Sequence, residues 1–329
     1  MSAALLVRAL RDPACVGRLD AQAWNSLLAA AKAERLVATL AWRVEGVAVP
    51  EAVRPILKDA QRDAAREAQQ ALWEADRAAH ALRECGVRVV LLKGAAYAAA
   101  ELKAAQGRFI GDLDILVPRA AMAEVERALI AAGWEWVKED AYDDAYYRQW
   151  MHELPPMIHV ERDRMIDVHH TILPLTARPK PDAAAMLAEA VSITEGLYVL
   201  SPEHRVVHAA AHMLADGDLQ GGLRNLWDIY CLLAEADPAR LARRAAQHGL
   251  DRHVAQARRL AAALYGEGAR LTLWDRIVRA RLLARDGWGR ETRKGLVFAF
   301  YVRSHLLRMP PLMLARHLLT KWRKGHRPQ

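Results

Sequence analysis

The sequence predicts an α+β fold, in which a small mixed sheet with its own helices is flanked by N-terminal helices and by an all-helical C-terminal region. Three observations lead to this prediction. Helix-favouring residues such as Ala, Leu, Arg and Glu are abundant in a chain that is 53% hydrophobic. Apolar residues recur at three- and four-residue spacing near both ends. Short β-branched runs occur in the middle. The 329 residues allow two or three domains, and we expect boundaries at 1–83, 84–200 and 201–329.

The first 83 residues predict helices. Apolar positions in "AWNSLLAAAKAERLVATLAWRV" follow a helical period. Pro50 and Pro55 mark a break. The stretch "DAQRDAAREAQQALWEADRAAHALRECG" then predicts one long helix that stops at Gly86.

The middle of the chain predicts alternating strands and helices. "VRVVLLKG" predicts a strand that ends at Lys93–Gly94, with a helix directly after it. "DLDILVP" predicts a second strand, followed by a helix that stops at Gly133. "WEWVKED", "MIHVERD" and "RMIDVHHTI" predict three more strands, the last two joined by a turn around Asp163. We interpret the wider aromatic stretch "WEWVKEDAYDDAYYRQW" as an exposed hairpin that covers the sheet, with base stacking as the alternative.

The C-terminal segment predicts helices to its end. Ser201 is placed as an N-cap and Pro202 as the first helical residue. The chain carries a net charge of +8, and after Glu291 it has nine basic residues and no acidic one. The basic charge is therefore a property of this end. This basic end would be able to bind nucleic acid, an anionic membrane surface or an acidic carrier protein. The alternative is that it is a solvated helix end without a partner.

Cysteine usage and hydropathy bound the cellular setting. Cys15, Cys85 and Cys231 are widely spaced and form no CxxC motif, which argues against a disulfide scaffold or a zinc–thiolate site. The N-terminal "MSAALLVRALRDPAC" predicts an amphipathic helix rather than a signal peptide. No run reaches the roughly 18 apolar residues of a membrane span. We expect a cytoplasmic protein.

Two carboxylates interrupt an apolar strand. Asp112 and Asp114 are two residues apart, so their side chains share one face of the strand. Carboxylates this close repel each other unless a cation lies between them. Mg²⁺ is commonly held by one or two carboxylates together with substrate phosphates. The pair therefore predicts a magnesium site.

Two neighbouring segments complete this prediction. At Lys93–Gly94 a strand passes directly into a helix, and backbone N–H groups at a helix N-terminus favour an anion such as phosphate. Asp167 lies on the later strand "MIDVHHTI". A third carboxylate on a neighbouring strand would complete a two-metal site, with ions roughly 3.5–4 Å apart. Phosphate and metal binding together predict a nucleoside triphosphate with Mg²⁺.

The order "LLKG", "DLDILV" and "IDVHH" resembles the nucleotidyltransferases of the DNA-polymerase-β-like superfamily. In that superfamily a Gly-containing turn precedes a D-x-D strand, and a third Asp lies on a later strand. The chain is most similar to bacterial members that carry "LKG…R…DLDLLV", a later "D-hydrophobic-H" and a helical domain. The resemblance covers residues 88–170, and the matching positions are Lys93, Gly94, Arg108, Asp112, Asp114, Asp167 and His169.

The resemblance implies Mg²⁺-dependent transfer of a nucleoside monophosphate, with AMP from ATP favoured, to an acceptor hydroxyl. Asp112 and Asp114 would hold two ions, and Asp167 would hold the catalytic ion and help to deprotonate the acceptor. The residues implied to bind the nucleotide are Lys93, Gly94, Ala95 and Arg108. The superfamily has Gly-Gly or Gly-Ser at this turn, so Ala95 leaves out a hydroxyl that could touch the phosphates.

Three further residues are secondary candidates. His169 either orients a carboxylate or bonds to backbone. His212 belongs to a helical series with His204 and His208, which suits helix contacts or zinc, and we favour a place in the active-site cleft for it. Asp228 contacts the nucleotide or acceptor, or it pairs with Arg224 one turn earlier.

The acceptor stays open at this point. A small molecule is favoured. AMP transfer to a protein hydroxyl, as in antitoxin-like relatives, would use the same three aspartates, and RNA is a weaker variant. A nucleotide-binding scaffold without turnover is the alternative outside enzymes. Ala95 favours it, and three intact, mutually repelling aspartates argue against it.

Overall fold

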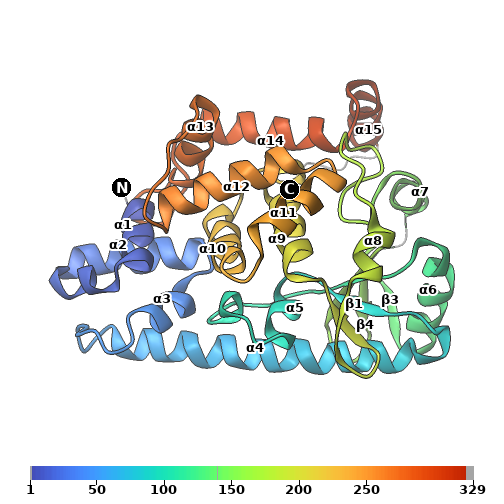
Figure 1. Ribbon diagram of the computed structural model, residues 1–329, viewed down its shortest axis with the longest axis horizontal. Helices are drawn as coiled ribbons and strands as arrows, with labels where there is room; N and C mark the ends of the chain where they lie inside the picture. The colour runs from blue at the N-terminus through green and yellow to red at the C-terminus, as the bar shows by residue number, and fades with distance from the viewer. Residues whose placement is uncertain (1, 139, 324–329) are drawn as a thin grey trace.

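One seven-stranded mixed sheet lies between two helical regions in the computed structural model (Figure 1). The structure describes residues 2–138 and 140–323. The predicted α+β class, with helices before and after the sheet, is confirmed. Among the helices of the described residues, none combines the length and apolar content needed to cross a membrane.

Within the described residues, four α-helices precede the sheet, and the last of them packs against it. Their bounds are α1 Ser2–Arg11, α2 Ala21–Ala33, α3 Val37–Arg43 and α4 Arg54–Ala81. The 28-residue α4 is the predicted long helix, and it runs beneath the sheet along the lower edge of Figure 1. A short 3₁₀ turn follows it, and Gly86 then adopts a left-handed conformation with φ of 61°, as expected of a helix stop. Buried Glu74 of α4 accepts hydrogen bonds from Arg162 at 2.8 and 3.0 Å, which ties α4 to the turn before β5.

The sheet has the strand order β3-β4-β5-β2-β1-β7-β6. Its strands are β1 Val89–Leu91, β2 Leu113–Leu116, β3 Trp134–Trp136, β4 Met157–His159, β5 Met165–His169, β6 Val191–Thr194 and β7 Leu197–Val199. The central strand β2 is antiparallel to β1 and parallel to β5, and the register places Asp114 opposite Asp167. The β4–β5 turn lies at Asp163 as predicted, with a φ of 53°.

Three local predictions differ from the structure. The aromatic stretch is not a hairpin beyond β3, because Ala141–Trp150 form a helix, α7. Its Arg148 bonds to Asp144 one turn earlier and to Glu126 of the preceding helix, contacts that periodicity alone does not reveal. The first strand ends at Leu91, so Lys93 begins a helix rather than ending a strand. The sequence analysis also missed β6 and β7, which are short and lie at one end of the sheet.

Helices connect and cover the strands. Within and directly after the sheet region they are α5 Lys93–Ala99, α6 Met122–Ala131 and α8 Ala183–Ala188. The C-terminal helices are α9 Pro202–Ala210, α10 Gly222–Leu233, α11 Pro238–Gln247, α12 Asp251–Leu264, α13 Leu273–Leu282, α14 Lys294–Arg308 and α15 Pro311–Arg323. Ser201 and Pro202 take the predicted N-cap and first helical positions of α9. A π-helical turn, Ala211–Asp216, continues α9.

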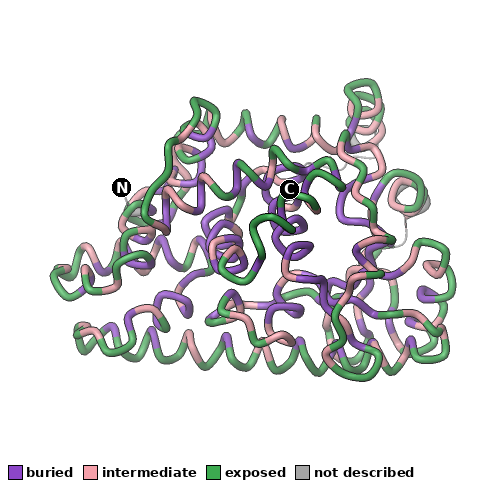
Figure 2. The backbone as a smooth tube through the Cα atoms, viewed as in Figure 1, coloured by how far each residue is buried: buried purple, intermediate pink, exposed green. Residues whose placement is uncertain are grey.

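Buried residues form one continuous hydrophobic cluster that extends from Ala3 to Phe300. Figure 2 shows them concentrated in the middle of the molecule, along α9, α10 and the strands. The three predicted domains share this cluster. Their boundaries remain a prediction.

We predict that Gly107→Ala destabilises the fold by about 3 kcal/mol or more. Gly107 has a φ of +67°, and a Cβ there would lie 2.3 Å from the Thr39 nitrogen and 2.4 Å from the Ala38 carbonyl carbon. Backbone atoms of α3 cannot yield as a side chain can, so overpacking adds to the left-handed strain. Urea unfolding measures the effect.

Gly46→Ala is the matched control. Gly46 also has a left-handed φ, of +79°, but nothing lies within 4 Å of its added Cβ. Its cost is the conformational term alone, about 1 kcal/mol. Equal losses in the two variants would show that the close approach to α3 does not constrain the chain.

Candidate active site

Two carboxylates meet in the middle of the sheet. Asp114 on β2 and Asp167 on β5 are register partners on parallel strands, so their side chains lie on the same face. Asp114 is 2% exposed. Ligand atoms of Asp114, Asp167 and His169 lie within 4.8 Å of one another. Asp112 lies just before β2 and is exposed, and within the described chain it is not part of that group.

Lys93 supplies a positive charge to the buried Asp114. Its Nζ donates to Asp114 Oδ1 at 2.6 Å. Burial on its own would raise the pKa of Asp114, but the Lys93 ammonium and a hydrogen bond from His169 outweigh it and hold that pKa well below its usual range. Lys93 has a φ of 47°, a conformation that costs a residue with a side chain about 1–3 kcal/mol and is concentrated at functional sites.

His169 connects Asp114 to a second acid. Its Nε2 lies 3.0 Å from Asp114 Oδ1, and its Nδ1 lies 3.3 Å from Oε2 of Glu153. Burial would lower the pKa of His169, but the hydrogen bond to Asp114 and the charge of Glu153 raise it. The imidazole is therefore held between two carboxylates.

Asp167 is the carboxylate without a compensating partner. Its Oδ1 is buried and, among the described residues, has no hydrogen-bond partner. Burial, reinforced by the charges of Asp114 and Glu153, raises the pKa of Asp167 to about 7. An unpaired buried carboxylate oxygen beside a second carboxylate suits a hard divalent cation.

Gly94 and Ala95 are buried in the first turn of α5. A Cβ on Gly94 would lie 2.8 Å from Arg108 Nε and 3.0 Å from Ile110 Cγ1, so the glycine makes room for Arg108. Backbone N–H groups in a first helical turn have no intrahelical acceptor. They are the groups that this turn offers to an anion.

Arg108 and Asp228 form a buried ion pair. Arg108 Nη1 donates to Asp228 Oδ2, and Arg224 Nη2 donates to Asp228 Oδ1 at 2.7 Å. The guanidinium of Arg108 also lies over the Tyr97 ring, 5.5 Å from its centroid. Arg224 extends the network to Thr39 of α3 at 2.6 Å. Asp228 thus makes the predicted pair with Arg224 and a second pair that sequence spacing could not indicate.

The histidines after the sheet divide between two places. His208 and His212 line a small cavity of about 20 Å³ together with Lys93, Tyr97, Ala209, Asn225 and the Arg108–Asp228 pair. Burial lowers the pKa of His208 to about 3, so it is neutral. His204 instead contacts His248 at 3.0 Å. The three do not converge on a metal position within the described chain, which argues against the zinc alternative.

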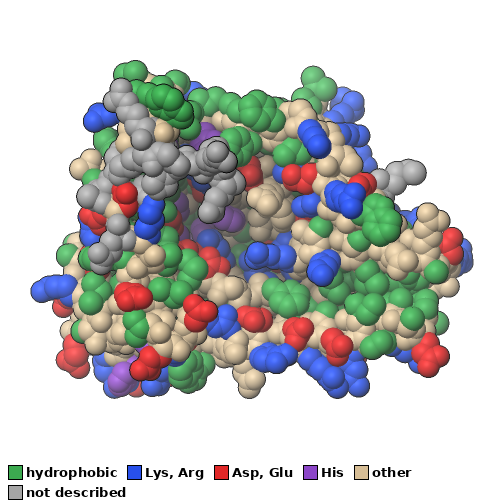
Figure 3. Space-filling model, turned by 180° about the vertical axis from the view of Figure 1, so that it is seen from behind, with side chains coloured by type: hydrophobic (Ala, Val, Ile, Leu, Met, Phe, Trp, Pro, Cys, Tyr) green, Lys and Arg blue, Asp and Glu red, His purple; other side chains and the backbone are tan. Residues whose placement is uncertain are grey.

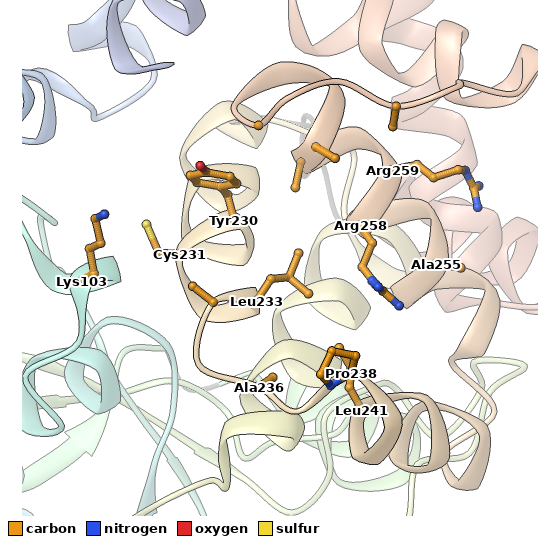
Figure 4. Close-up of a pocket in the computed structure, with 15 residues that line it drawn as sticks. Lys103, Tyr230, Cys231, Leu233, Ala236, Pro238, Leu241, Ala255, Arg258 and Arg259 are labelled. Atoms are coloured by element: carbon orange, nitrogen blue, oxygen red, sulfur yellow. The ribbon is translucent and has the colours of Figure 1, made fainter. Parts of the chain in front are cut away.

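Figure 3 shows the molecule from behind the view of Figure 1. The surface is hollowed near its centre there, and histidine and basic side chains are visible in the hollow. A larger cavity of about 680 Å³ lies elsewhere, between α10, α11 and α12 (Figure 4). Apolar residues such as Leu233 and Leu241 form much of its wall, and none of the predicted site residues lines it. Size alone therefore does not locate the chemistry.

Sequence reasoning missed His152 and Glu153. The segment that holds them pairs with β5, since Leu154 N–H donates to the Val168 carbonyl at 2.9 Å. Burial raises the pKa of Glu153 and lowers the pKa of His152. The one signal in the sequence is a His–Glu dipeptide directly before an apolar Leu-Pro-Pro stretch.

We predict that the metal-free protein loses stability as pH rises through 7, because of Asp167. Its folded pKa of about 7 is above the usual 3.8, so between these two values the fold holds a proton that the unfolded chain has lost, and stability falls as pH rises through that window. Asp167→Asn should come closest to wild type near pH 4 and exceed it at pH 8 by about 2–4 kcal/mol. Urea unfolding with a chelator present tests this, and Asp163→Asn, in the exposed β4–β5 turn, is the control. Parallel pH curves for wild type and Asp167→Asn would contradict the assignment.

We also predict that Lys93→Met destabilises the protein by about 3–5 kcal/mol at pH 7, since it leaves the Asp114 charge buried without its ammonium partner. The double variant Lys93→Met/Asp114→Asn should recover much of the loss, because no isolated charge remains. A double-mutant cycle on the free energy of unfolding measures the coupling. Additive losses would show that the two groups act independently.

A comparison with known families assigns the chain to one of them. The profile of a family described as "Uncharacterised nucleotidyltransferase" matches residues 20–266, a span that contains the carboxylate pair and the Arg108–Asp228 pair. No curated protein matches the chain. Since the match covers well over half of the sequence, the chain belongs to this uncharacterised nucleotidyltransferase family.

Proposed function

We propose that the protein transfers a nucleoside monophosphate, AMP from ATP in the favoured case, to a hydroxyl of a small acceptor with the help of Mg²⁺. The observation that carries the proposal is the register pairing of Asp114 with Asp167 beside Lys93. Family membership supports nucleotidyl transfer. The donor, metal and acceptor are our inference.

The residues fit a hard divalent ion. Asp114 and Asp167 would hold it, with Asp112 at the exposed rim of the site. Bound Mg²⁺ would supply charge neutralisation for the triphosphate and for the developing negative charge. A second ion would need Asp112 as a ligand. Since Asp112 is exposed and lies outside the carboxylate group in the described chain, the binding of two ions remains a prediction.

Lys93 changes partners in this proposal. Without nucleotide, its ammonium compensates Asp114 and feels Asp112 and Asp167 as well, and these charges raise its pKa although burial opposes them. Once a cation neutralises the carboxylates, the ammonium is free to bind phosphate. The first-turn N–H groups of α5 and the unpartnered buried Nε of Arg108 are further donors for the phosphates.

The chemical step is an in-line displacement. The acceptor oxygen forms a bond to the α-phosphorus, the bond from that phosphorus to the bridging oxygen breaks, and pyrophosphate leaves. Asp167 receives the hydroxyl proton, because its Oδ1 has no hydrogen-bond partner among the described residues and can accept one from the acceptor. Catalysis then depends mainly on positioning and charge neutralisation.

A nucleotide-binding protein without turnover is the second candidate. The Lys93–Asp114 ion pair favours it, since an internal ammonium already neutralises one carboxylate. A protein or RNA acceptor stays a prediction within the transferase proposal.

The three free cysteines accord with the expected cytoplasmic setting.

We predict Mg²⁺-dependent nucleotide binding in calorimetry with ATP, GTP, CTP and UTP. Asp167→Asn should weaken it at least about tenfold, because one charged ligand oxygen is lost. Asp163→Asn, the same substitution in the exposed turn before β5, should bind like wild type. Absence of binding by folded wild type would contradict the proposal. Binding with no transfer to any acceptor would favour the second candidate.

A further inference from the structure

Two side chains, Glu153 and His152, lie on the side of His169 that faces away from Asp114. Oε2 of Glu153 lies 3.3 Å from Nδ1 of His169 and 3.5 Å from Nε2 of His152. All three candidate ligand atoms lie within 4.8 Å of one another. This His–Glu–His cluster shares only His169 with the carboxylate site.

Two of the three spacings match a tetrahedral metal site. Zn²⁺ binds imidazole nitrogen and carboxylate oxygen at about 2.0–2.2 Å, and a tetrahedron with such bonds has edges of roughly 3.4 Å. The two contacts to Glu153 Oε2 have this length. Two imidazoles directed at one carboxylate oxygen are also a donor set typical of zinc, whereas Mg²⁺ favours oxygen alone.

The hydrogen bonding of His169 leaves the correct nitrogen for a metal. Nε2 lies 3.0 Å from Asp114 Oδ1, and an N–H there donates to the carboxylate. Nδ1 is directed to the cluster, and a metal there would take the place of the proton that Glu153 attracts to it. Metal-bound histidines commonly donate their other N–H to a carboxylate in this order.

The backbone around the cluster is held in place. Glu153 forms an isolated β-bridge with His169, and His170 N–H donates to the His152 carbonyl at 2.8 Å. The rings of His152 and His169 stack at 5.1 Å with an interplanar angle of 26°. The three ligands are therefore preorganised by β5 and the segment beside it.

A cavity of about 240 Å³ adjoins the cluster at Glu153 and is lined by Arg119, Arg148 and His170 among others. With three protein ligands, a fourth position would remain for water or another small ligand.

We propose that His152, Glu153 and His169 form a zinc site, separate from the Asp114–Asp167 site and linked to it through the His169 ring. The bound ion fixes His169 in the form that donates Nε2–H to Asp114. It thereby holds the orientation of that carboxylate. The site goes beyond nucleotidyl transfer, and its occupancy does not depend on turnover.

The test uses the full chain, stripped with a chelator and dialysed. Zn²⁺ is titrated against a chromophoric chelator, and Co²⁺ serves as a spectroscopic probe of tetrahedral coordination. We expect one tight Zn²⁺ per chain that excess Mg²⁺ does not displace, and a tetrahedral Co²⁺ spectrum. His152→Ala and Glu153→Gln should each weaken Zn²⁺ binding by at least about 100-fold, beyond the range for loss of an outer partner.

Two variants are controls. Exposed His80→Ala and Asp167→Asn should leave Zn²⁺ affinity unchanged. The near-isosteric Glu153→Gln guards against misfolding of His152→Ala, and circular dichroism confirms the fold of each. Failure of wild type to bind Zn²⁺, or wild-type Zn²⁺ affinity in both ligand variants, would overturn the proposal, as would a loss confined to Asp167→Asn. If Mg²⁺-dependent nucleotide binding persists in that event, only the zinc inference fails.

Discussion

The buried charge of Asp114 is the constraint on which the centre of the protein depends. A carboxylate that is 2% exposed is strongly disfavoured unless charges and hydrogen bonds compensate it. Lys93 and His169 provide both. To reach Asp114, Lys93 begins α5 in a left-handed conformation, and β5 must pair with β2 in the observed parallel register. The local strain and the sheet topology thus serve one compensated charge.

A second polar network closes the helical regions over this centre. Asp228 of α10 accepts hydrogen bonds from Arg108 and Arg224, and Arg224 continues to Thr39 in the N-terminal helices. Thr39 donates to the carbonyls of Gln106 and Gly107 at 3.0 and 3.1 Å. Buried charges leave little freedom to rearrange when each has a partner. The network therefore joins the three parts of the chain at the wall of the site.

Much of the fold could be predicted because its signals are local. Long α4 has sustained helical periodicity and a glycine stop, and the strands around Asp114 and Asp167 are apolar runs with turn residues between them. The wrong hairpin at α7 and the missed strands β6 and β7 show the limit. These segments are short, and α7 is supported by contacts of Arg148 with Glu126 of another helix, which periodicity does not record.

The sequence by itself determined which residues are able to carry charge and chemistry: the D-x-D pair, the later aspartate and the Lys-Gly turn, all recognisable from fixed spacing along the chain. Only the tertiary structure decided which of them meet. Strand register brings Asp114 to Asp167 and leaves Asp112 exposed. Helix packing joins Arg108 to Asp228 across 120 residues, and the bridge to β5 brings Glu153 to His169. These contacts join residues far apart in the sequence. They depend on long-range packing, which the spacing of residues along the chain does not predict.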